Sequence, residues 1–241
     1  MNISLKDIKE FSKEYNNNPI NKIIENAITA NGLEEVCLNR DIVEENQFVF
    51  NIELPDSKRY DQKDSWKCWI YAGLNMIKHN MAKNLKIDLM DFELSSNYIA
   101  FYDKLEKSNY VYENIIQLPE NADLDFIKKE KIIDNCVAET GDWEHFKTVI
   151  SKYGIVPNKY MPNPVEGERV EKITRLYREK VKKDIVYLWK AKQQKKDQET
   201  LRNMKKEYIK ENYIFLSKIL GEPPHTFDYE YICLLYTSDA A

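Results

Sequence analysis

One stretch of the sequence carries residue types that together could perform nucleophilic chemistry. In DQKDSWKCW, residues 61–69, a glutamine stands six positions ahead of a Cys-Trp pair. Apolar residues recur at helical spacing from about Ser65 onward, so Cys68 is predicted to lie in the first turn of a helix. A cysteine attacks an acyl carbon as the thiolate, and a helix N-terminus stabilises negative charge. The stretch therefore suggests a cysteine nucleophile.

The same stretch could supply hydrogen-bond donors for the oxyanion of a tetrahedral intermediate. The backbone N–H of Cys68 has no intrahelical partner at a helix start, and Gln62 offers a side-chain amide from the preceding loop. Trp69 would exclude water from the nucleophile, and Lys67 would add a solvated cation nearby. The alternative interpretation is that Cys68 is a small apolar residue in a buried helix, since free cysteines are often buried.

A cysteine nucleophile needs a base, and the sequence offers three histidines, namely His79, His145 and His225. His79 lies on the same predicted helix as Cys68, and at ~1.5 Å per residue it would be roughly 16 Å away. A nucleophile–base hydrogen bond spans roughly 3 Å, which excludes His79. His145, at a helix start, and His225, after a Pro-Pro turn, are more simply explained as surface or substrate-contacting residues. The base therefore stays unassigned.

Composition and charge indicate a soluble, cytoplasmic protein. The chain has 241 residues, of which 43% are hydrophobic and 32% charged, and a formal net charge of −4, so nucleic-acid binding is not expected. No apolar run approaches the ~20 residues of a membrane span, and the N-terminus lacks a signal-peptide pattern. The cysteines are scattered, with no C-x-x-C pair, so we expect neither a metal, nor a cofactor, nor a disulfide framework.

The hydrophobic pattern predicts a chain dominated by helices. Apolar residues alternate over residues 48–54, which predicts one strand there. Residues 157–164 hold three prolines and are expected to form an irregular loop. Helical spacing predicts helices at about 4–15, 20–31, 65–83, 96–107 and 141–153, followed by two long amphipathic helices within 166–220.

Several segments, in the same order, resemble the bleomycin hydrolase and bacterial aminopeptidase C family of papain-like cysteine peptidases. DQKDSWKCWIYAGLN is similar to the family's nucleophile segment, and the other similar segments are 26–40, 91–116, 139–157, 173–190 and 220–231. The resemblance implies that Cys68 is the nucleophile and Gln62 the oxyanion-hole donor. It also implies a substrate-binding Gly-Gly pair, which reads Thr140-Gly141 here, and Trp69 is expected to be a substrate-binding residue as well.

The resemblance further implies an α+β, papain-like fold of which this chain is the helix-rich N-terminal half. The family's catalytic His and Asn lie in the C-terminal half of a chain about twice this long, so we expect a truncated form that is inactive alone. The expected divisions are an N-terminal arm at 1–57, a nucleophile-bearing half-domain at 58–165, a helical insertion at 166–232 and a tail at 233–241. That tail, which contains CLLYTSDAA, departs from the family pattern and is interpreted as non-native.

The function implied by the resemblance is that of a cysteine-type aminopeptidase acting on peptides, homohexameric in its full-length form. Two departures leave an alternative open. Trp66 and Thr140 stand where the family has Gly, at positions where glycine lets a substrate backbone approach closely. Either the cleft has repacked around them, or the chain is a catalytically impaired paralogue that acts as an assembly or binding component. Nucleic-acid binding, known among relatives with basic channel surfaces, has little support from the net charge.

Overall fold

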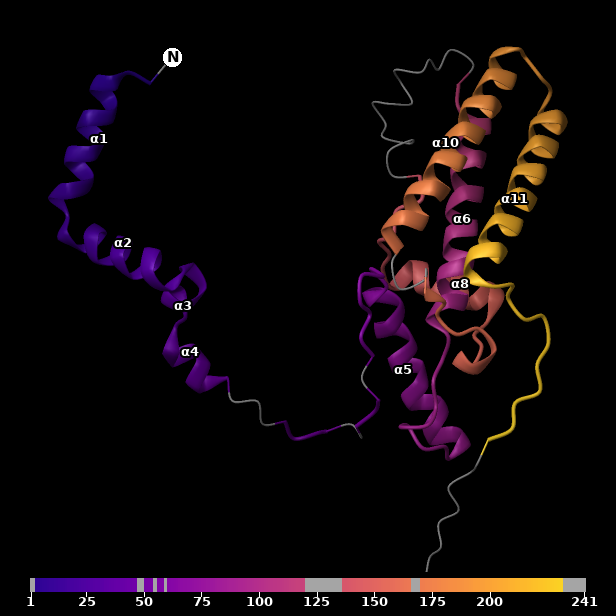
Figure 1. Ribbon diagram of the computed structural model, residues 1–241, viewed down its shortest axis with the longest axis horizontal. Helices are drawn as coiled ribbons and strands as arrows, with labels where there is room; N and C mark the ends of the chain where they lie inside the picture. Colours follow the sequence, from indigo (N-terminus) through magenta and orange to yellow (C-terminus); the bar gives the residue numbers. More distant parts are fainter. Residues whose placement is uncertain are drawn as a thin grey trace, which may run out of the picture. The chain divides into compact units, whose positions relative to one another are not determined.

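The computed structural model describes residues 3–46, 50–53, 56–58, 60–119, 136–165 and 170–231. The chain divides into two compact units, residues 1–54 and 55–241, and each is described by itself. The first unit contains α1 (Leu5–Asn17), α2 (Pro19–Asn31), α3 (Leu33–Cys37) and α4 (Arg40–Glu45) (Figure 1). The second contains α5 (Cys68–Leu85), α6 (Ser96–Gln117), α8 (Trp143–Tyr153), a 3-10 turn at Asn158–Tyr160, α10 (Val170–Gln193) and α11 (Gln198–Leu220).

In the first unit, α1, α2 and α4 have side-chain N-caps, whereas α3 has none, and the helices have no core of their own. Ser4 caps α1 through a capping box with Asp7, which confirms the predicted N-cap, and Asn18 caps α2 just before Pro19. None of the residues in α1 to α4 is buried. Their apolar side chains, including Phe11 and Ile23, remain exposed. Local capping thus defines most of these helices, while the first unit by itself leaves their apolar faces uncovered.

The strand predicted at 48–54 is wrong for the four residues that the structure describes. Residues 50–53 form no strand, and Phe50 and Ile52 are 64% and 77% exposed. Residues 48, 49 and 54 lie outside the described residues. Alternation of apolar residues makes a strand only where a neighbouring strand accepts its hydrogen bonds. An isolated antiparallel bridge joins Leu94 and Pro157.

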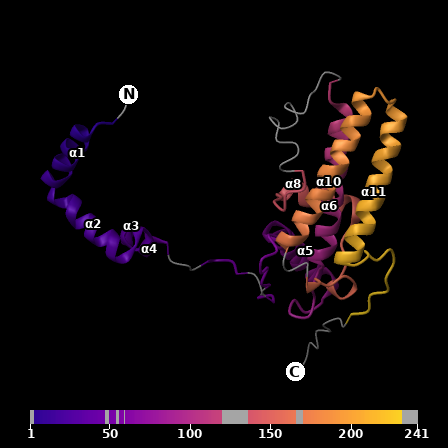
Figure 2. The same cartoon turned by 45° about the horizontal axis from the view of Figure 1, so that its top comes forward.

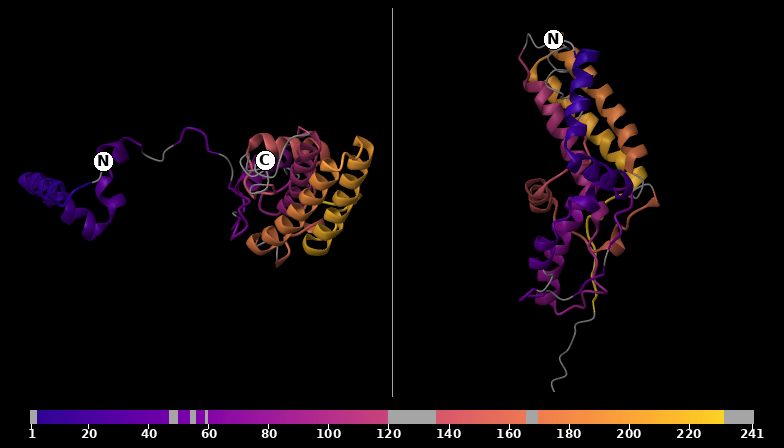
Figure 3. Two further views of the ribbon diagram at one scale, coloured as in Figure 1. Left: turned by 90° about the horizontal axis from the view of Figure 1, so that it is seen from above. Right: turned by 90° about the vertical axis from the view of Figure 1, so that its left-hand side faces the viewer.

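A three-helix group forms most of the core of the second unit. Helices α10 and α11 both run along α6, as Figures 1 and 3 show. The apolar residues of α10 recur every three or four positions and so share one face of the helix. Those residues are all nearly inaccessible, namely Ile173, Tyr177, Val181, Ile185 and Leu188. The two long amphipathic helices predicted within 166–220 are therefore confirmed.

A buried polar network fixes the register of the same three helices. The hydroxyl of Tyr112 on α6 donates to Asp184 on α10 over 2.7 Å, and the side-chain amide of Asn212 on α11 donates to Tyr112 over 3.0 Å. Lys180 pairs with Asp184 at 2.9 Å. Burial raises the pKa of Tyr112, so the phenol stays protonated and acts as a donor. Sliding one helix by a turn would leave these groups buried without partners, which disfavours other registers.

Helices α5 and α8 pack at one end of this group (Figure 2). Their close approach requires Gly73 of α5, because a Cβ there would lie 2.5 Å from the ring of Phe146 on α8. Asp142 caps α8, and Gly154, with φ +76°, ends it as predicted. Helix α6 is longer than predicted and extends to Gln117, because its buried face continues through Val111, Tyr112 and Ile115.

Candidate active site

Cys68 is the first residue of α5, and its free thiol is exposed. The interpretation of Cys68 as a buried apolar residue is therefore wrong. Gln62 is also exposed. Its backbone carbonyl oxygen accepts a hydrogen bond from the backbone N–H of Ser65 over 3.1 Å. Both residues thus occupy one loop-to-helix segment at the protein surface. Their assignment as nucleophile and oxyanion-hole donor stays a prediction.

The loop before Cys68 contains a residue in a strained backbone conformation. Trp66 has φ +54°, in the left-handed region that glycine adopts without steric cost. Its indole is 63% exposed, so little packing offsets that strain. The backbone at this position is therefore one that suits glycine, the residue that the family resemblance implies, although the side chain has changed.

A pair of substitutions at Trp66 tests this strain. Trp66→Gly and Trp66→Ala both remove the indole, but only glycine relieves the positive φ. We expect the glycine variant to be more stable than the alanine variant by about 1 kcal/mol. Alanine is destabilised by the left-handed conformation in the folded state, and the greater chain entropy of glycine in the unfolded state offsets part of that difference. Urea unfolding of both variants measures the difference. Equal stability, or a more stable alanine variant, would contradict the argument.

Lys67 is placed differently from the prediction of a solvated cation. It is 3% exposed, and its Nζ donates to Oδ1 of Asn163 over 2.9 Å. The same oxygen accepts a hydrogen bond from Ser96, while the Asn163 amide donates to the Tyr71 hydroxyl, each over 3.1 Å. Lys67 is the N-cap residue of α5, and its side chain runs inward because the loop around Asn163 offers an acceptor there. The residue before Cys68 is thereby anchored to the core.

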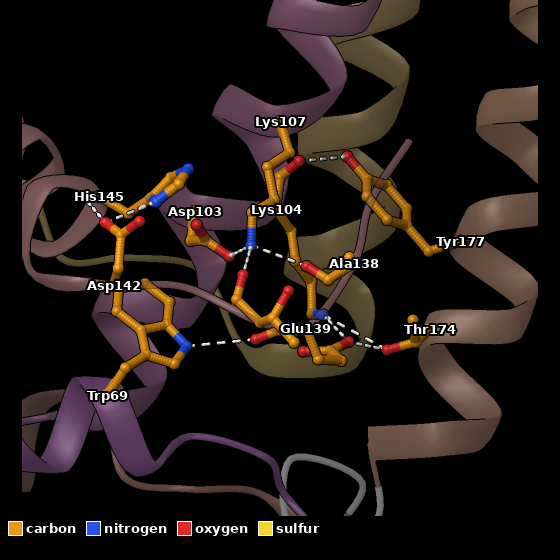
Figure 4. Close-up of polar contacts among 11 residues, drawn as sticks. Trp69, Asp103, Lys104, Lys107, Ala138, Glu139, Asp142, His145, Thr174 and Tyr177 are labelled. Carbon is orange, nitrogen blue, oxygen red and sulfur yellow. Dashed lines mark hydrogen bonds and ion pairs between the residues drawn. The ribbon is translucent and has the colours of Figure 1, made fainter. Parts of the chain in front are cut away.

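Trp69 links the start of α5 to the segment 138–141. Its indole Nε1 donates to the carbonyl oxygen of Glu139 over 3.2 Å, as Figure 4 shows. Its ring also faces Gly141, where an added Cβ would lie only 2.5 Å from ring atoms. Only a glycine lets the backbone come so close to the indole. The structure therefore brings together two of the predicted substrate-binding residues, Trp69 and Gly141.

Lys107 of α6 holds the same segment from the other side. Its ammonium donates to the carbonyl oxygens of Ala138 at 2.7 Å and Thr140 at 2.8 Å, and it pairs with Asp103 at 2.7 Å (Figure 4). It also lies 5.7 Å from the centroid of the Trp69 ring. Burial raises the pKa of Asp103, and the adjacent Lys107 ammonium opposes that rise. One buried ion pair thus orients the backbone at Thr140, the third predicted substrate-binding residue.

The side chain of Glu139 ties the segment to α10. Its carboxylate pairs with Lys104 of α6 and accepts a hydrogen bond from Thr174 of α10. The hydroxyl of Tyr177, one turn further along α10, donates to the backbone carbonyl of Lys104 over 3.2 Å (Figure 4). Sequence reasoning missed these supporting residues. The cations at 104 and 107, on a helix otherwise rich in apolar residues, were the signal that could have revealed them.

The three histidines lie on α5, on α8 and in the segment that follows α11. His79 is on the same continuous helix, so the predicted exclusion is confirmed at ~1.5 Å per residue. The Nδ1 of His145 lies 2.9 Å from Asp142, whose pKa is lowered by hydrogen bonds from the His145 backbone and ring. His225 is exposed beyond α11. No hydrogen bond joins any of them to Cys68 in the described structure, so the base stays unassigned.

Two cavities lie near this segment. The larger, of about 780 Å³, is lined by Trp66, Thr140 and the face of α10 that includes Arg175 and Arg178. The smaller, of about 420 Å³, lies between α6 and α8 and is lined in part by Lys107 and His145. Cys68 lines neither. Among the residues described here, no cluster of His, Cys, Asp and Glu could hold a metal ion, and no helix could cross a membrane.

The architecture matches that of a solved peptidase. The crystal structure of PepW from Lactobacillus rhamnosis superposes with a TM-score of 0.86 at 33% sequence identity, over 95% of this chain and 51% of the PepW chain. The fold is therefore papain-like. A sequence profile of the Peptidase C1-like family matches residues 2–233, and the chain belongs to that family.

Curated relatives agree with this family. The chain is 35% identical to Aminopeptidase C of Listeria monocytogenes over 95% of its own length and 51% of that protein. It is 31% identical to Aminopeptidase G of Lactobacillus delbrueckii subsp. lactis, over 95% of this chain and 52% of the relative. These findings confirm the resemblance that the sequence segments indicated. The chain spans about half the length of the curated relatives it matches.

Proposed function

We propose that this chain provides the nucleophile-bearing part of a cysteine-type aminopeptidase, which hydrolyses peptide bonds. The observation that carries the proposal is the exposed Cys68 thiol at the start of α5, beside the Trp69–Gly141 contact. Membership of the Peptidase C1-like family and the aminopeptidase relatives support it. A thiol that opens a helix has the local field that stabilises a thiolate.

In the proposed mechanism, the Cys68 thiolate attacks the carbonyl carbon of the scissile bond. The resulting oxyanion accepts hydrogen bonds from the Cys68 backbone N–H and the Gln62 side-chain amide. Collapse of the intermediate breaks the C–N bond and leaves an acyl-thioenzyme, which water then hydrolyses to the acid and the free thiol. The proton to the leaving amine would come from a histidine oriented by an asparagine. Both would lie outside this sequence, because the relatives are about twice as long.

The substrate backbone would lie along the segment 139–141. Lys107 already occupies the carbonyls of Ala138 and Thr140. Among the described residues, Gly141 forms no backbone hydrogen bond outside the helices, so its N–H and C=O would be free to pair with an extended peptide. The Trp69 ring shields one side of this backbone. Thr140 would then flank the bound peptide with its side chain.

The remaining features of the whole protein are part of the same proposal. It would be a cytoplasmic α+β enzyme, with strands contributed by polypeptide outside this sequence, and a homohexamer that acts on peptides. Its parts within this sequence would be the arm at 1–57, the half-domain at 58–165 and the insertion at 166–232, whereas residues 233–241 would be a non-native tail that does not belong to it. The uncovered apolar faces of α1 to α4 support an assembly in which another surface covers them.

Alkylation rates test the proposed nucleophile in this chain. Cys68 and Cys37 are both exposed, but Cys68 begins α5 whereas Cys37 ends α3. We expect iodoacetamide to modify Cys68 about three- to tenfold faster at pH 7, because a helix N-terminus favours the thiolate and a C-terminus does not. Peptide mapping by mass spectrometry measures both rates in one sample. The buried Cys136 provides the unreactive baseline.

The second candidate function is that of a catalytically impaired paralogue acting as an assembly or binding component. The observation that favours it is the indole of Trp66, which lines the larger cavity at a position where the family resemblance implies glycine. Equal alkylation of Cys68 and Cys37, together with no turnover of aminoacyl amides by the complete protein, would favour this candidate over the peptidase.

A further inference from the structure

The larger cavity joins the predicted nucleophile loop to α10. Trp66 forms one wall, Glu139 and Thr140 form the second, and Arg175 and Arg178 lie on the α10 side. Its volume of about 780 Å³ falls within the range of roughly 300–1,000 Å³ that small-molecule sites occupy. Because Thr140 belongs to the proposed substrate-binding segment, a peptide bound there would extend into or past this cavity.

The lining of the cavity carries unpaired positive charge. Lys172, Arg175 and Arg178 recur every three residues and so share one side of α10. In the part of the chain that the structure describes, none of the three forms an ion pair. The lining also contains two acids, but the carboxylate of Glu139 is already bound by Lys104 and Thr174. Glu171 alone is left to offset the three cations, so the cavity favours an anionic group.

Arg178 adds an unsatisfied donor to the positively charged lining of the cavity. Its Nε atom is buried and has no hydrogen-bond partner. Buried donors are nearly always satisfied in folded proteins, so this Nε is an exception that a bound acceptor could satisfy. A carboxylate is the partner that suits a guanidinium, since its two oxygens accept two parallel N–H bonds.

We infer that Arg175 and Arg178 bind a carboxylate of the peptide substrate in this cavity, next to the exposed indole of Trp66. The inference rests on the proposed peptidase function and adds a substrate class to it, namely peptides with a negative charge near the bond to be cleaved. The indole provides an apolar wall for the methylene groups that carry the carboxylate. That carboxylate is either an acidic side chain or the C-terminus of a short peptide.

Four short peptides separate these two sources. They carry either Glu or Gln at one position and end in either a free or an amidated C-terminus. Their affinities are measured by titration calorimetry on the chain with Cys68→Ala, so that nothing is hydrolysed. We expect the peptides with the recognised carboxylate to bind at least about tenfold more tightly than their neutral counterparts. A preference for Glu assigns the side chain, and a preference for the free end assigns the C-terminus.

Charge-neutralising variants locate the preference on α10. Arg175→Gln and Arg178→Gln should each remove most of the preference while leaving the binding of the neutral peptides unchanged. Lys190→Gln is the matched control, since it removes one positive charge from the same helix about 18 Å beyond Arg178. Arg178→Lys keeps the charge but loses the planar fork, and it should give an intermediate affinity. Circular dichroism confirms that each variant is folded.

The outcomes separate this inference from the proposed function. Equal binding of all four peptides, no binding of any, or a preference that survives both arginine variants would overturn the inference. A carboxylate preference without turnover by the complete protein would reject the peptidase and keep the binding site. Turnover of peptides without any charge preference would keep the peptidase function and reject the carboxylate-binding site.

Discussion

Replacing Cys68 with alanine is expected to reduce peptide turnover by at least about 10⁴-fold in the protein that carries the complete catalytic set. The alanine has no sulfur to form the acyl-thioenzyme, and because residue 68 is exposed, the substitution removes no core packing. The measurement is kcat/KM for an aminoacyl amide. Cys37→Ala removes another exposed thiol and should leave turnover unchanged. Retained turnover in the Cys68 variant would reject the proposed nucleophile.

Gln62→Ala refines the same test. Loss of one oxyanion donor costs about 10²–10³ in kcat and little in KM, because the donor acts mainly in the transition state. The thiol itself is untouched, so alkylation of Cys68 should proceed at its original rate. A variant that loses alkylation and turnover together would show that Gln62 shapes the loop rather than binds an oxyanion.

The sequence predicted those helices whose ends carry local signals. Ser4, Asn18 and Gly154 each cap a helix with their own side chain or backbone, so a short window contains the information. Whether residues 48–54 form a strand could not be decided from such a short window of sequence. A strand depends on hydrogen bonds from a neighbour, and residues 50–53 have no strand beside them in the described structure. The α+β class therefore remains a prediction.

The sequence predicted the candidate site residues, but not the residues that hold them in place. The Gln62–Cys68 spacing and the segment that contains Gly141 could be read from the sequence. The burial of Lys67 could not, because its acceptor, Asn163, lies far away in the sequence. The same holds for Lys107, which meets the carbonyl of Thr140 from another helix. Long-range contacts of this kind become visible only when the helices are packed.

The contact between Gly141 and Trp69 yields the second large effect. Gly141→Ala would put a Cβ 2.5 Å from the indole, closer than two carbon atoms can approach. Gly141 does not have a positive φ, so alanine is allowed by the backbone and the collision is the whole cost. Either the ring or the segment 138–141 must move, and overpacking of this kind costs about 1–3 kcal/mol of unfolding free energy. Urea unfolding measures that cost.

A double-mutant cycle attributes the loss to this one contact. Trp69→Leu removes the ring that meets the new methyl group, so the double variant Trp69→Leu/Gly141→Ala should lose less stability than the sum of the two single variants. The expected coupling is about 0.5–3 kcal/mol, as for other residues in direct contact. Because the Trp69 indole also donates to Glu139, the Leu variant alone should be destabilised. Strict additivity would mean that the segment accommodates the methyl group by moving away from the indole, and the close approach would then not be needed for the fold.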